Sequence, residues 1–260
     1  MIIAKHILKV LPGFEAISLE EIEKASLMRR KDSKYIFSVE HLPLLLEKAS
    51  KYYRILEIEN KRTHNYQTIY FDTPGMDMYH MHHRGIVNRY KIRFRKYENS
   101  DSMFLEVKEK DARGVTIKNR MQTGNGKAFI LSGEEEFLSM FTPYQDRKVI
   151  PVLENNFNRI TLVSADQSER ITLDYHLWFS NPITDQTIEI PGISIAEIKY
   201  GSQLTGSRFH AALRSQKIVS RRFSKYCFGL ALLNPGLKQN LFKEKIRYVN
   251  KINNYYLQSI

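Results

Sequence analysis

Residues 90–97 read YKIRFRKY, a stretch in which charged and apolar side chains alternate. Three cations, Lys91, Arg93 and Arg95, occupy the odd positions, with apolar or aromatic residues between them. Because successive side chains of a β-strand point to opposite faces, a strand here has one apolar and one cationic face. Cations two residues apart repel one another, so the pattern indicates an anionic partner for that face.

The composition is that of a folded protein with a strongly basic charge balance. The chain has 260 residues, of which 42% are hydrophobic and 12% aromatic, enough for a sizeable core. Its formal net charge of +12 favours a polyanionic partner: nucleic acid, a nucleotide, polyphosphate or an anionic membrane. The single cysteine, Cys227, excludes an intramolecular disulfide and a cysteine-based zinc site.

The sequence shows neither a targeting segment nor a boundary between domains. The amino-terminal stretch does not resemble a signal peptide, and no apolar window reaches the length of about 18 residues that a membrane span needs. We therefore expect a cytoplasmic protein. No Pro/Gly/Ser-rich linker or fixed-period repeat interrupts the sequence, so residues 1–260 are expected to form a single domain.

Period-two alternation recurs along the chain and predicts β-strands. The predicted strands are 34–38, 66–72, 89–97, 103–110, 114–121, 157–164, 169–179, 186–190 and 194–201. Helices are expected from Ser18 toward Leu27, over 39–53, after Ser132, around 207–216 and around 223–233. We therefore predict an α+β fold: an antiparallel β-barrel with helices packed outside.

The polar faces of these strands are mostly cationic. Beyond Arg93 and Arg95, the residues that share such faces are Glu106, Lys108 and Lys110; Thr116, Lys118 and Arg120; Phe157, Arg159 and Thr161; Arg170, Thr172, Asp174 and His176; and Ile195, Glu197 and Lys199. Each face alone is consistent with the solvated side of an antiparallel sheet. A solvated face interleaves both charges, however, and the opposite apolar faces require cover. Both observations favour a closed sheet with a cationic interior, which needs a bound polyanion or counter-ions.

Nucleic acid is a less favoured polyanion than phosphate. Proteins that bind single strands interleave aromatic and cationic side chains on one face, so that bases can stack. Here Tyr90 and Phe94 alternate away from Arg93 and Arg95. Polyphosphate or the triphosphate of a nucleotide therefore fits the pattern better.

No phosphate loop or nucleophilic motif accompanies the cationic faces. Glycine-rich sequences of the GxxxxGK[ST] or GxGxxG type are absent, and TGNGK at 123–127 indicates only a turn. His80, His82 and His83 lack a carboxylate or cysteine at ligand spacing, so a polar loop or short helix is favoured over a metal site. Any chemistry must come from cations and a few carboxylates, as phosphoryl transfer requires.

Nine stretches, in order along the chain, carry a family resemblance. They are LMRRKDSKYIF (27–37), IYFDTP (69–74), NRYKIRFRKY (88–97), FLEVKEK (104–110), TIKNRM (116–121), PVLENNFNRITL (151–162), ERITLDYHLWF (169–179), IAEIKYG (195–201) and RRFSKYCFGLALL (221–233). Together they resemble the polyphosphate-polymerase domain of the vacuolar transporter chaperone (VTC) family. That family belongs to the CYTH-like superfamily of triphosphate tunnel metalloenzymes.

The resemblance implies an eight-stranded antiparallel tunnel whose basic residues hold a phosphate chain. By motif and alternation, the expected catalytic residues are Arg93, Arg95, Lys108, Arg159 and Arg170. The expected phosphate-binding residues are Lys34, Lys118, Arg120, Lys199 and Lys225. Glu197, in the AEIK motif, is the expected ligand of Mn²⁺ or Mg²⁺. Lys91 shares the face of Arg93 but has no counterpart in the family motifs.

The implied activity is that of a metal-dependent phosphotransferase, which moves the γ-phosphate of ATP onto a growing polyphosphate chain. Triphosphatases of the superfamily begin with an acidic ExExK strand, whereas this chain has KDSKYIF at 31–37. The departure favours a polymerase over two alternatives: an inorganic or nucleoside triphosphate hydrolase, and a non-catalytic polyphosphate-binding module. Phe157 stands where the family motif has an aromatic hydroxyl, so no role of that hydroxyl is expected here.

Overall fold

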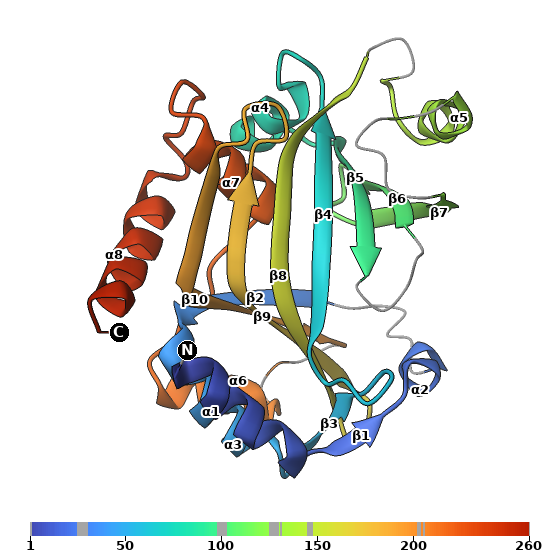
Figure 1. Ribbon diagram of the computed structural model, residues 1–260. Coiled ribbons are helices and arrows are strands. Elements are labelled where there is room, and N and C mark those ends of the chain that lie inside the picture. Colours follow the sequence, from blue (N-terminus) through green and yellow to red (C-terminus); the bar gives the residue numbers. More distant parts are fainter. Residues whose placement is uncertain are drawn as a thin grey trace.

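A strongly curved, mainly antiparallel sheet forms the centre of the protein, with helices around it (Figure 1). The computed structural model describes residues 2–24, 31–97, 103–124, 130, 132–144, 148–201, 204 and 206–259. Within these ranges the α-helices are α1 (Ile2–Val10), α2 (Leu19–Lys24), α3 (Leu42–Ala49), α4 (Asp77–Arg84), α5 (Ser132–Phe141), α6 (Arg208–Ser215), α7 (Lys225–Leu233) and α8 (Lys243–Ser259). The strands are β1 (Glu15–Ile17), β2 (Lys31–Ser38), β3 (Tyr53–Leu56), β4 (His64–Asp72), β5 (Arg89–Tyr97), β6 (Met103–Lys110), β7 (Thr116–Thr123), β8 (Ile150–Ser164), β9 (Glu169–Ser180) and β10 (Thr187–Tyr200).

Eight of these strands form one continuous antiparallel path, in the order β2-β10-β9-β8-β4-β5-β6-β7. The short β1 pairs in parallel with β3, which in turn pairs with the end of β8. The curvature makes β2 cross the direction of β4 and β8 at a steep angle (Figure 1). The α+β class and the eight-stranded antiparallel path are thus confirmed. The predicted closure of the sheet into a barrel is not found, because among the described residues β2 and β7 do not pair with each other, and we call the opening between them the seam.

Residues that pair across neighbouring strands share a face of the sheet, so the register tests the predicted alternation. Arg93 on β5 lies opposite Glu106 on β6, which lies opposite Arg120 on β7. At the other end of the path, Glu197 on β10 lies opposite Lys34 on β2. The register through the intervening strands puts all five residues on one side, which we call the inner face.

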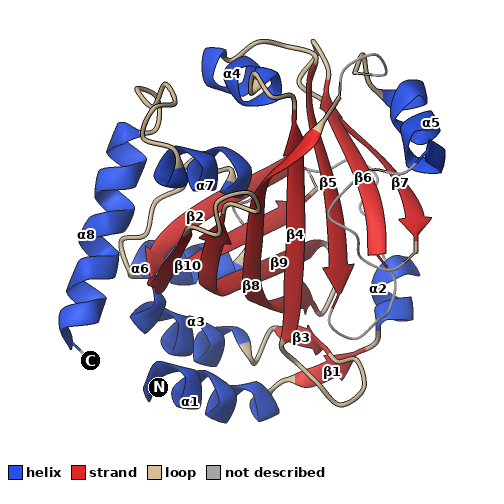
Figure 2. Cartoon of the chain, turned by 45° about the horizontal axis from the view of Figure 1, so that its top comes forward, coloured by secondary structure: helices blue, strands red, loops and turns tan. Residues whose placement is uncertain are grey.

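The opposite, outer face is apolar and covered by helices, as expected (Figure 2). Ile92 and Phe94 of β5 are buried in one cluster with Leu138 of α5. Helices α1, α3 and α6 cover β8, β9 and β10 in the same way, with Leu45 and Leu213 fully buried. This cover removes the outer face from water, which leaves the inner face to meet a ligand.

Helix α7 departs from the expectation, because it packs on the inner face. Its sequence KYCFGLALL is apolar on nearly all sides, as a helix surrounded by protein must be. Its Tyr226 ring lies 5.2 Å from that of Tyr70, which pairs with Arg93 and therefore belongs to the inner face. Phe228 contacts Phe179 in the same cluster. The helix thus fills one part of the inner face and leaves the charged part uncovered.

Two strands predicted at 186–190 and 194–201 are a single strand, β10, with a bulge between Ile190 and Ser194. Pro191 has no N–H for the ladder. A Cβ on Gly192 would lie 2.9 Å from Cα of Asn253 in α8, and the side chain of Asn253 accepts the Gly192 N–H at 2.9 Å. The bulge therefore holds α8 against the sheet.

Other boundaries differ where tertiary contacts decide them. The helix predicted over 39–53 is a 3₁₀ turn followed by α3, which ends at Ala49 because Tyr53 enters β3 and pairs with β8. The strand predicted at 157–164 is the second half of β8, and α1, β1, β3 and α8 were not predicted. The capping box at Ser18 is present, with Glu21 and Ser18 bonding reciprocally, but Leu27 lies outside the described residues.

No helix in the described ranges has the length and apolarity to cross a membrane.

Candidate functional site

The inner face carries three clusters in which one carboxylate contacts two cations. In the first, Glu106 receives hydrogen bonds from Arg93, including one of 2.7 Å from Nε, and its other oxygen contacts Lys118. Burial alone would raise the pKa of Glu106, but Arg93, Arg95 and Lys118 together hold that pKa well below its usual range. The carboxylate therefore stays ionised and fixes both cations in place.

Asp174 on β9 is the centre of the second cluster. Arg159 of β8 donates to both of its oxygens, at 2.6 and 2.8 Å, and Lys225 at the start of α7 contacts one of them. Burial would raise the pKa of Asp174, but the two cations keep it below its usual value. Burial also lowers the pKa of Lys225 to about 8, although Asp174 opposes that effect. Because α7 lies on the inner face, its first residue reaches a site built by strands.

The third cluster joins β10 to the edge strand β2. Lys34 contacts one oxygen of Glu197, and Nζ of Lys199 lies 3.7 Å from the other. Burial would raise the pKa of Glu197, but Lys199 and Lys34 lower it well below its usual range. Its side chain is 18% exposed, so this carboxylate is within reach of a ligand.

Three further cations of the inner face are not matched by carboxylates. Within the described ranges no carboxylate oxygen lies within 4.0 Å of the charged groups of Lys91, Arg95 or Lys108. The positive charge of Arg93, followed by burial, lowers the pKa of Lys108 well below its usual value. Nε of Arg95 is buried and has no hydrogen-bond acceptor in the described structure. A bound anion would relieve this repulsion, since unpaired buried charge is costly.

A cavity of about 650 Å³ opens beside these cations at the seam. Its wall includes both edges of the sheet, with Lys34 from β2 and Thr116 from β7. Eight lysines and arginines line it against two acids, so the cavity is strongly positive and suited to an anionic ligand. The lining residues are Asp32, Ser33, Lys34, His82, Gly85, Arg89, Lys91, Lys108, Glu109, Lys110, Thr116, Ser220, Arg221, Arg222, Phe223, Ser224, Phe228, Leu241, Phe242 and Lys245.

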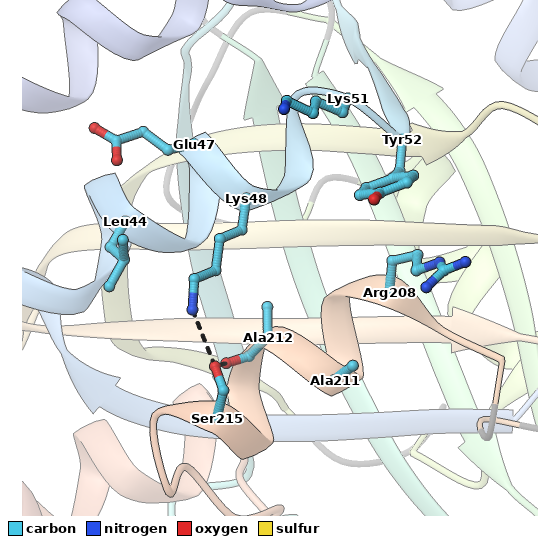
Figure 3. A pocket seen from close by; sticks show the side chains of 9 residues that line it. All are labelled: Leu44, Glu47, Lys48, Lys51, Tyr52, Arg208, Ala211, Ala212 and Ser215. Atoms are coloured by element: carbon cyan, nitrogen blue, oxygen red, sulfur yellow. Dashed lines mark hydrogen bonds between the residues drawn. The ribbon is translucent and has the colours of Figure 1, made fainter.

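A second hollow, of about 510 Å³, lies on the outer surface between α3 and α6 (Figure 3). Lys48 donates to Ser215 Oγ at 3.1 Å, and the guanidinium of Arg208 lies 5.2 Å over the ring of Tyr52. These cations are on helices that cover the outer face, and they already have neutral or aromatic partners. We therefore assign the candidate site to the inner face.

The family model described as the VTC domain matches residues 29–234. The chain belongs to the VTC domain family. No curated protein matches the sequence. Solved structures similar to this VTC-domain protein include the putative adenylyl cyclase HpAC1 from Hippeastrum, described as having a dominant triphosphatase activity, with 13% identity over 78% of this chain and 96% of that chain and a TM-score of 0.48.

Two other solved structures match this VTC-domain protein at similar sequence identity but with lower TM-scores. The PH1819 protein of Pyrococcus horikoshii OT3 has 15% identity over 78% of this chain and 98% of that chain, with a TM-score of 0.42. The Pct1 RNA triphosphatase of S. pombe has 13% identity over 85% of this chain and 76% of that chain, with a TM-score of 0.26.

Nine of the eleven residues predicted for the site of this VTC domain belong to the three ion-pair clusters of the inner face or to the cations beside them. They are Lys34, Arg93, Arg95, Lys108, Lys118, Arg159, Glu197, Lys199 and Lys225. Arg120 lies on exposed β7, its guanidinium 5.2 Å over the Phe104 ring, so it belongs to the rim. Arg170 donates to the carbonyl of Ile22 in α2 at 2.7 Å, a contact that ties the helix to the sheet.

Two histidine expectations are also resolved by the VTC-domain structure. His176 was expected on the face of Asp174, but this is wrong: it is exposed at a β9 bulge with a φ of 52°. The histidines of α4 diverge, since His83 is buried against Phe242 while His82 lines the cavity. In the described ranges no group of three or more His, Cys, Asp or Glu residues is arranged to hold a metal ion.

Sequence reasoning missed the role of two carboxylates and one aromatic residue. Alternation put Glu106 and Asp174 on the cationic faces, but only the structure shows that each holds two cations. Tyr66 of β4 was not singled out, although its ring stacks on Phe157 at 5.5 Å and lies 4.7 Å from the guanidinium of Arg159. The alternation of β4 could have placed Tyr66 on the inner face.

Glu197 fits a divalent ion that brings its own phosphate and water ligands. The carboxylate is already in contact with Lys34 and Lys199, and the described residues offer no complete protein cage. Mg²⁺ and similar hard cations are commonly held by one or two carboxylates together with substrate phosphates. The donor set is therefore suited to a metal that binds with a phosphate substrate.

Proposed function

We propose that this protein is a phosphotransferase of the polyphosphate-polymerase type. A terminal phosphate oxygen of a growing polyphosphate chain on the inner face attacks the γ-phosphorus of ATP, the bond from that phosphorus to the β,γ-bridging oxygen breaks, and ADP leaves. The observation that carries the proposal is the set of cations without carboxylate partners, Lys91, Arg95 and Lys108, beside three ordered ion-pair clusters. Membership of the VTC domain family supports the same assignment.

The aromatic residues of the inner face favour phosphate over a nucleobase as the ligand. One ring face of Tyr66 stacks on Phe157, and the guanidiniums of Arg159 and Arg95 lie 4.7 and 5.7 Å from its centroid. Base recognition in single strands needs open aromatic faces on which bases can stack. These rings serve instead to position arginines.

The ion-pair clusters contribute to catalysis by holding the arginines of the site in fixed orientations. Glu106 and Asp174 hold Arg93 and Arg159 in fixed orientations, so little reorganisation is needed when charge develops on a transferring phosphoryl group. The terminal phosphate of the acceptor chain is already a nucleophile at neutral pH and needs no strong general base. Catalysis then consists of alignment and electrostatic stabilisation.

Glu197 is the residue that would hold Mn²⁺ or Mg²⁺, with phosphate oxygens completing the coordination. Such an ion, when bound, supplies charge neutralisation between adjacent phosphates. Lys34 and Lys199 flank the same carboxylate and would bind the phosphate oxygens next to it. No paired glutamates stand on β2, which carries Lys31, Asp32 and Lys34, and this disfavours a hydrolytic site rich in metal.

Incubation of the purified protein with ATP and Mn²⁺, followed by a polyphosphate gel, tests the proposal. We expect long polyphosphate from the wild type and a loss of about a hundredfold or more in Arg93→Ala, in the range found for removal of one transition-state donor. Glu197→Ala should also lose most of the activity, because it removes the carboxylate that would hold the metal ion. Arg214→Ala, an exposed site on α6, is the matched control and should keep full activity. Cleavage of tripolyphosphate without polymer would instead establish a hydrolase, and binding without either reaction a binding module.

A further inference from the structure

The cavity at the seam has a wall that the sheet itself does not supply. Residues 220–224 line the cavity, and two of them bond to the outer edge of β2: Ser220 bridges to Tyr35, and the Arg221 N–H donates to the Lys34 carbonyl at 2.8 Å. This segment leads directly into α7, whose first residue, Lys225, belongs to the Asp174 cluster. The segment that walls the cavity is therefore directly followed in the sequence by a residue of the inner-face site, and the cavity and the site are also neighbours in space.

Helix α8, which follows the part of the chain matched by the VTC domain, fixes this wall. The guanidinium of Arg221 lies 4.3 Å over the ring of Tyr248, and the Tyr248 hydroxyl donates to the Ile36 carbonyl at 3.2 Å. One turn earlier, Lys245 lines the cavity. The helix thus both holds the segment against β2 and contributes a cation of its own.

Three cations of this wall, Arg221, Arg222 and Lys245, form a group that we call the seam cations. Within the described ranges no carboxylate oxygen lies within 4.0 Å of any of them. Nε of Arg221 is buried and has no acceptor there, and Nδ1 of His82, which also lines the cavity, is buried without a hydrogen-bond partner in the same ranges. A buried guanidinium donor without an acceptor, as at Arg221, indicates a ligand that supplies acceptor oxygens.

The path of a linear ligand is limited by α7. Beyond Lys225 the helix fills the inner face with apolar side chains, and Phe228 and Leu230 are buried against the strands. From Lys108 and Lys91, by contrast, the cavity continues past residues 220–224. A chain longer than a few phosphates can extend from the inner face in this direction without displacing packed residues.

We propose that the seam cavity is an outer subsite for a linear inorganic phosphate chain, which leaves the inner face laterally between β2 and β7 and contacts the seam cations. This proposal rests on the proposed function only in requiring that the inner face binds phosphate. A ligand as short as tripolyphosphate occupies the inner clusters and does not reach the seam cations. The subsite therefore discriminates by chain length.

Binding of inorganic tripolyphosphate and of long-chain polyphosphate to the full chain, each measured at several salt concentrations, tests this subsite. The informative variant is the double substitution Arg222→Ala/Lys245→Ala, since Arg222 is exposed and Lys245 half-buried. We expect its affinity for the long chain to fall about tenfold, while its Kd for tripolyphosphate changes by less than about twofold. The slope of log Kd against log salt for the long chain should fall by roughly one to two, as expected when two phosphate contacts are lost.

Arg214→Ala/Lys251→Ala is the matched control, because it removes the same charge from exposed positions on α6 and α8 that do not line the cavity. It should leave both affinities unchanged. If the seam variant lost affinity equally for tripolyphosphate and for the long chain, the cavity would be part of the inner site and the proposal would be overturned. A seam variant that lost affinity for neither ligand would also overturn it. If long-chain binding depends on the seam cations but the protein makes no polymer from ATP, the proposed function is refuted and the subsite proposal stands.

Discussion

Lys225 shows how one side chain in the site responds to opposing influences. Its ammonium contacts the Asp174 carboxylate and lies 3.8 Å from the centroid of the Phe157 ring. Burial nevertheless lowers its pKa to about 8. Above that pH the Asp174 cluster loses one of its two positive charges, so the charge of the inner face depends on pH in a range that is easily studied.

Phosphate binding should therefore weaken relative to a Lys225→Arg variant as pH rises through 8. Arginine keeps its charge, and the ratio of the two Kd values for tripolyphosphate cancels the titration of the ligand itself. We expect the ratio of wild-type to variant Kd to rise by about two- to fivefold between about pH 7 and about pH 9.5. Isothermal titration at several pH values measures it, and a ratio independent of pH would exclude Lys225 as the titrating group.

Unfolding at high pH cannot explain such a loss of binding, because the titration of Lys225 makes the folded state more stable as pH rises. The pKa of Lys225 is lower in the folded protein than the ordinary value of 10.5, so the unfolded chain binds more protons between pH 8 and 10.5. Stability contributed by this group therefore rises with pH in that window. A thermal melt at each pH is the control, because it should show no loss of stability attributable to Lys225 where binding weakens.

Among the elements, α7 has the tightest requirement on its sequence. Ser224 caps its first turn by accepting the Cys227 N–H at 3.3 Å, and most of the residues after Lys225 are buried. Gly229 allows the helix to approach the sheet, since a Cβ there would lie 2.5 Å from Phe179 and 2.9 Å from Leu153. The position of Lys225 in the site depends on this close packing.

Gly229→Ala should accordingly destabilise the protein, although alanine is the better helix former. Overpacking costs about 1–3 kcal/mol, against a gain of about 1 kcal/mol from helix propensity, so we expect a net loss of up to about 2 kcal/mol. Chemical denaturation measures the free energy of unfolding. Gly236→Ala is the control, because nothing lies within 4 Å of a Cβ at that position. Equal stability of the two variants would contradict close packing of α7.

For the whole molecule, charge is the dominant feature. The net charge of +12 is concentrated in part on the inner face and at the seam, where cations outnumber carboxylates. Self-repulsion of this kind opposes the compact state, and a polyanion that binds only the folded protein relieves it. Ligand binding and fold stability are therefore coupled in this protein.

Tripolyphosphate should raise the melting temperature by several degrees. At a concentration of one hundred times Kd the stabilisation is about 2.7 kcal/mol, and each kcal/mol corresponds to roughly 2–4 °C for a chain of this size. The shift should shrink as NaCl is added, because salt screens the interaction. Thermal melts in sodium chloride of matched ionic strength provide the control, and an equal shift there would point to screening without specific binding.

The sequence by itself determined the alternation, and with it the cationic inner face, the apolar outer face and the α+β class. These follow from a period of two along each strand, which is a local property of the chain. Only the tertiary structure decided which carboxylate each cation meets. Lys34 and Glu197 are 163 positions apart and are joined by the register of β2 with β10, which no local pattern specifies.

Tertiary packing also decided the contacts of Arg170 and the place of α7. Alternation correctly put Arg170 on the face of Thr172, but α2 folds back so that the Ile22 carbonyl accepts from its guanidinium. The apolar sequence of α7 predicted a buried helix without saying which face of the sheet would bury it. Packing with Tyr70 and Phe179 on the inner face settled that, because a helix apolar on all sides is stable only where protein surrounds it.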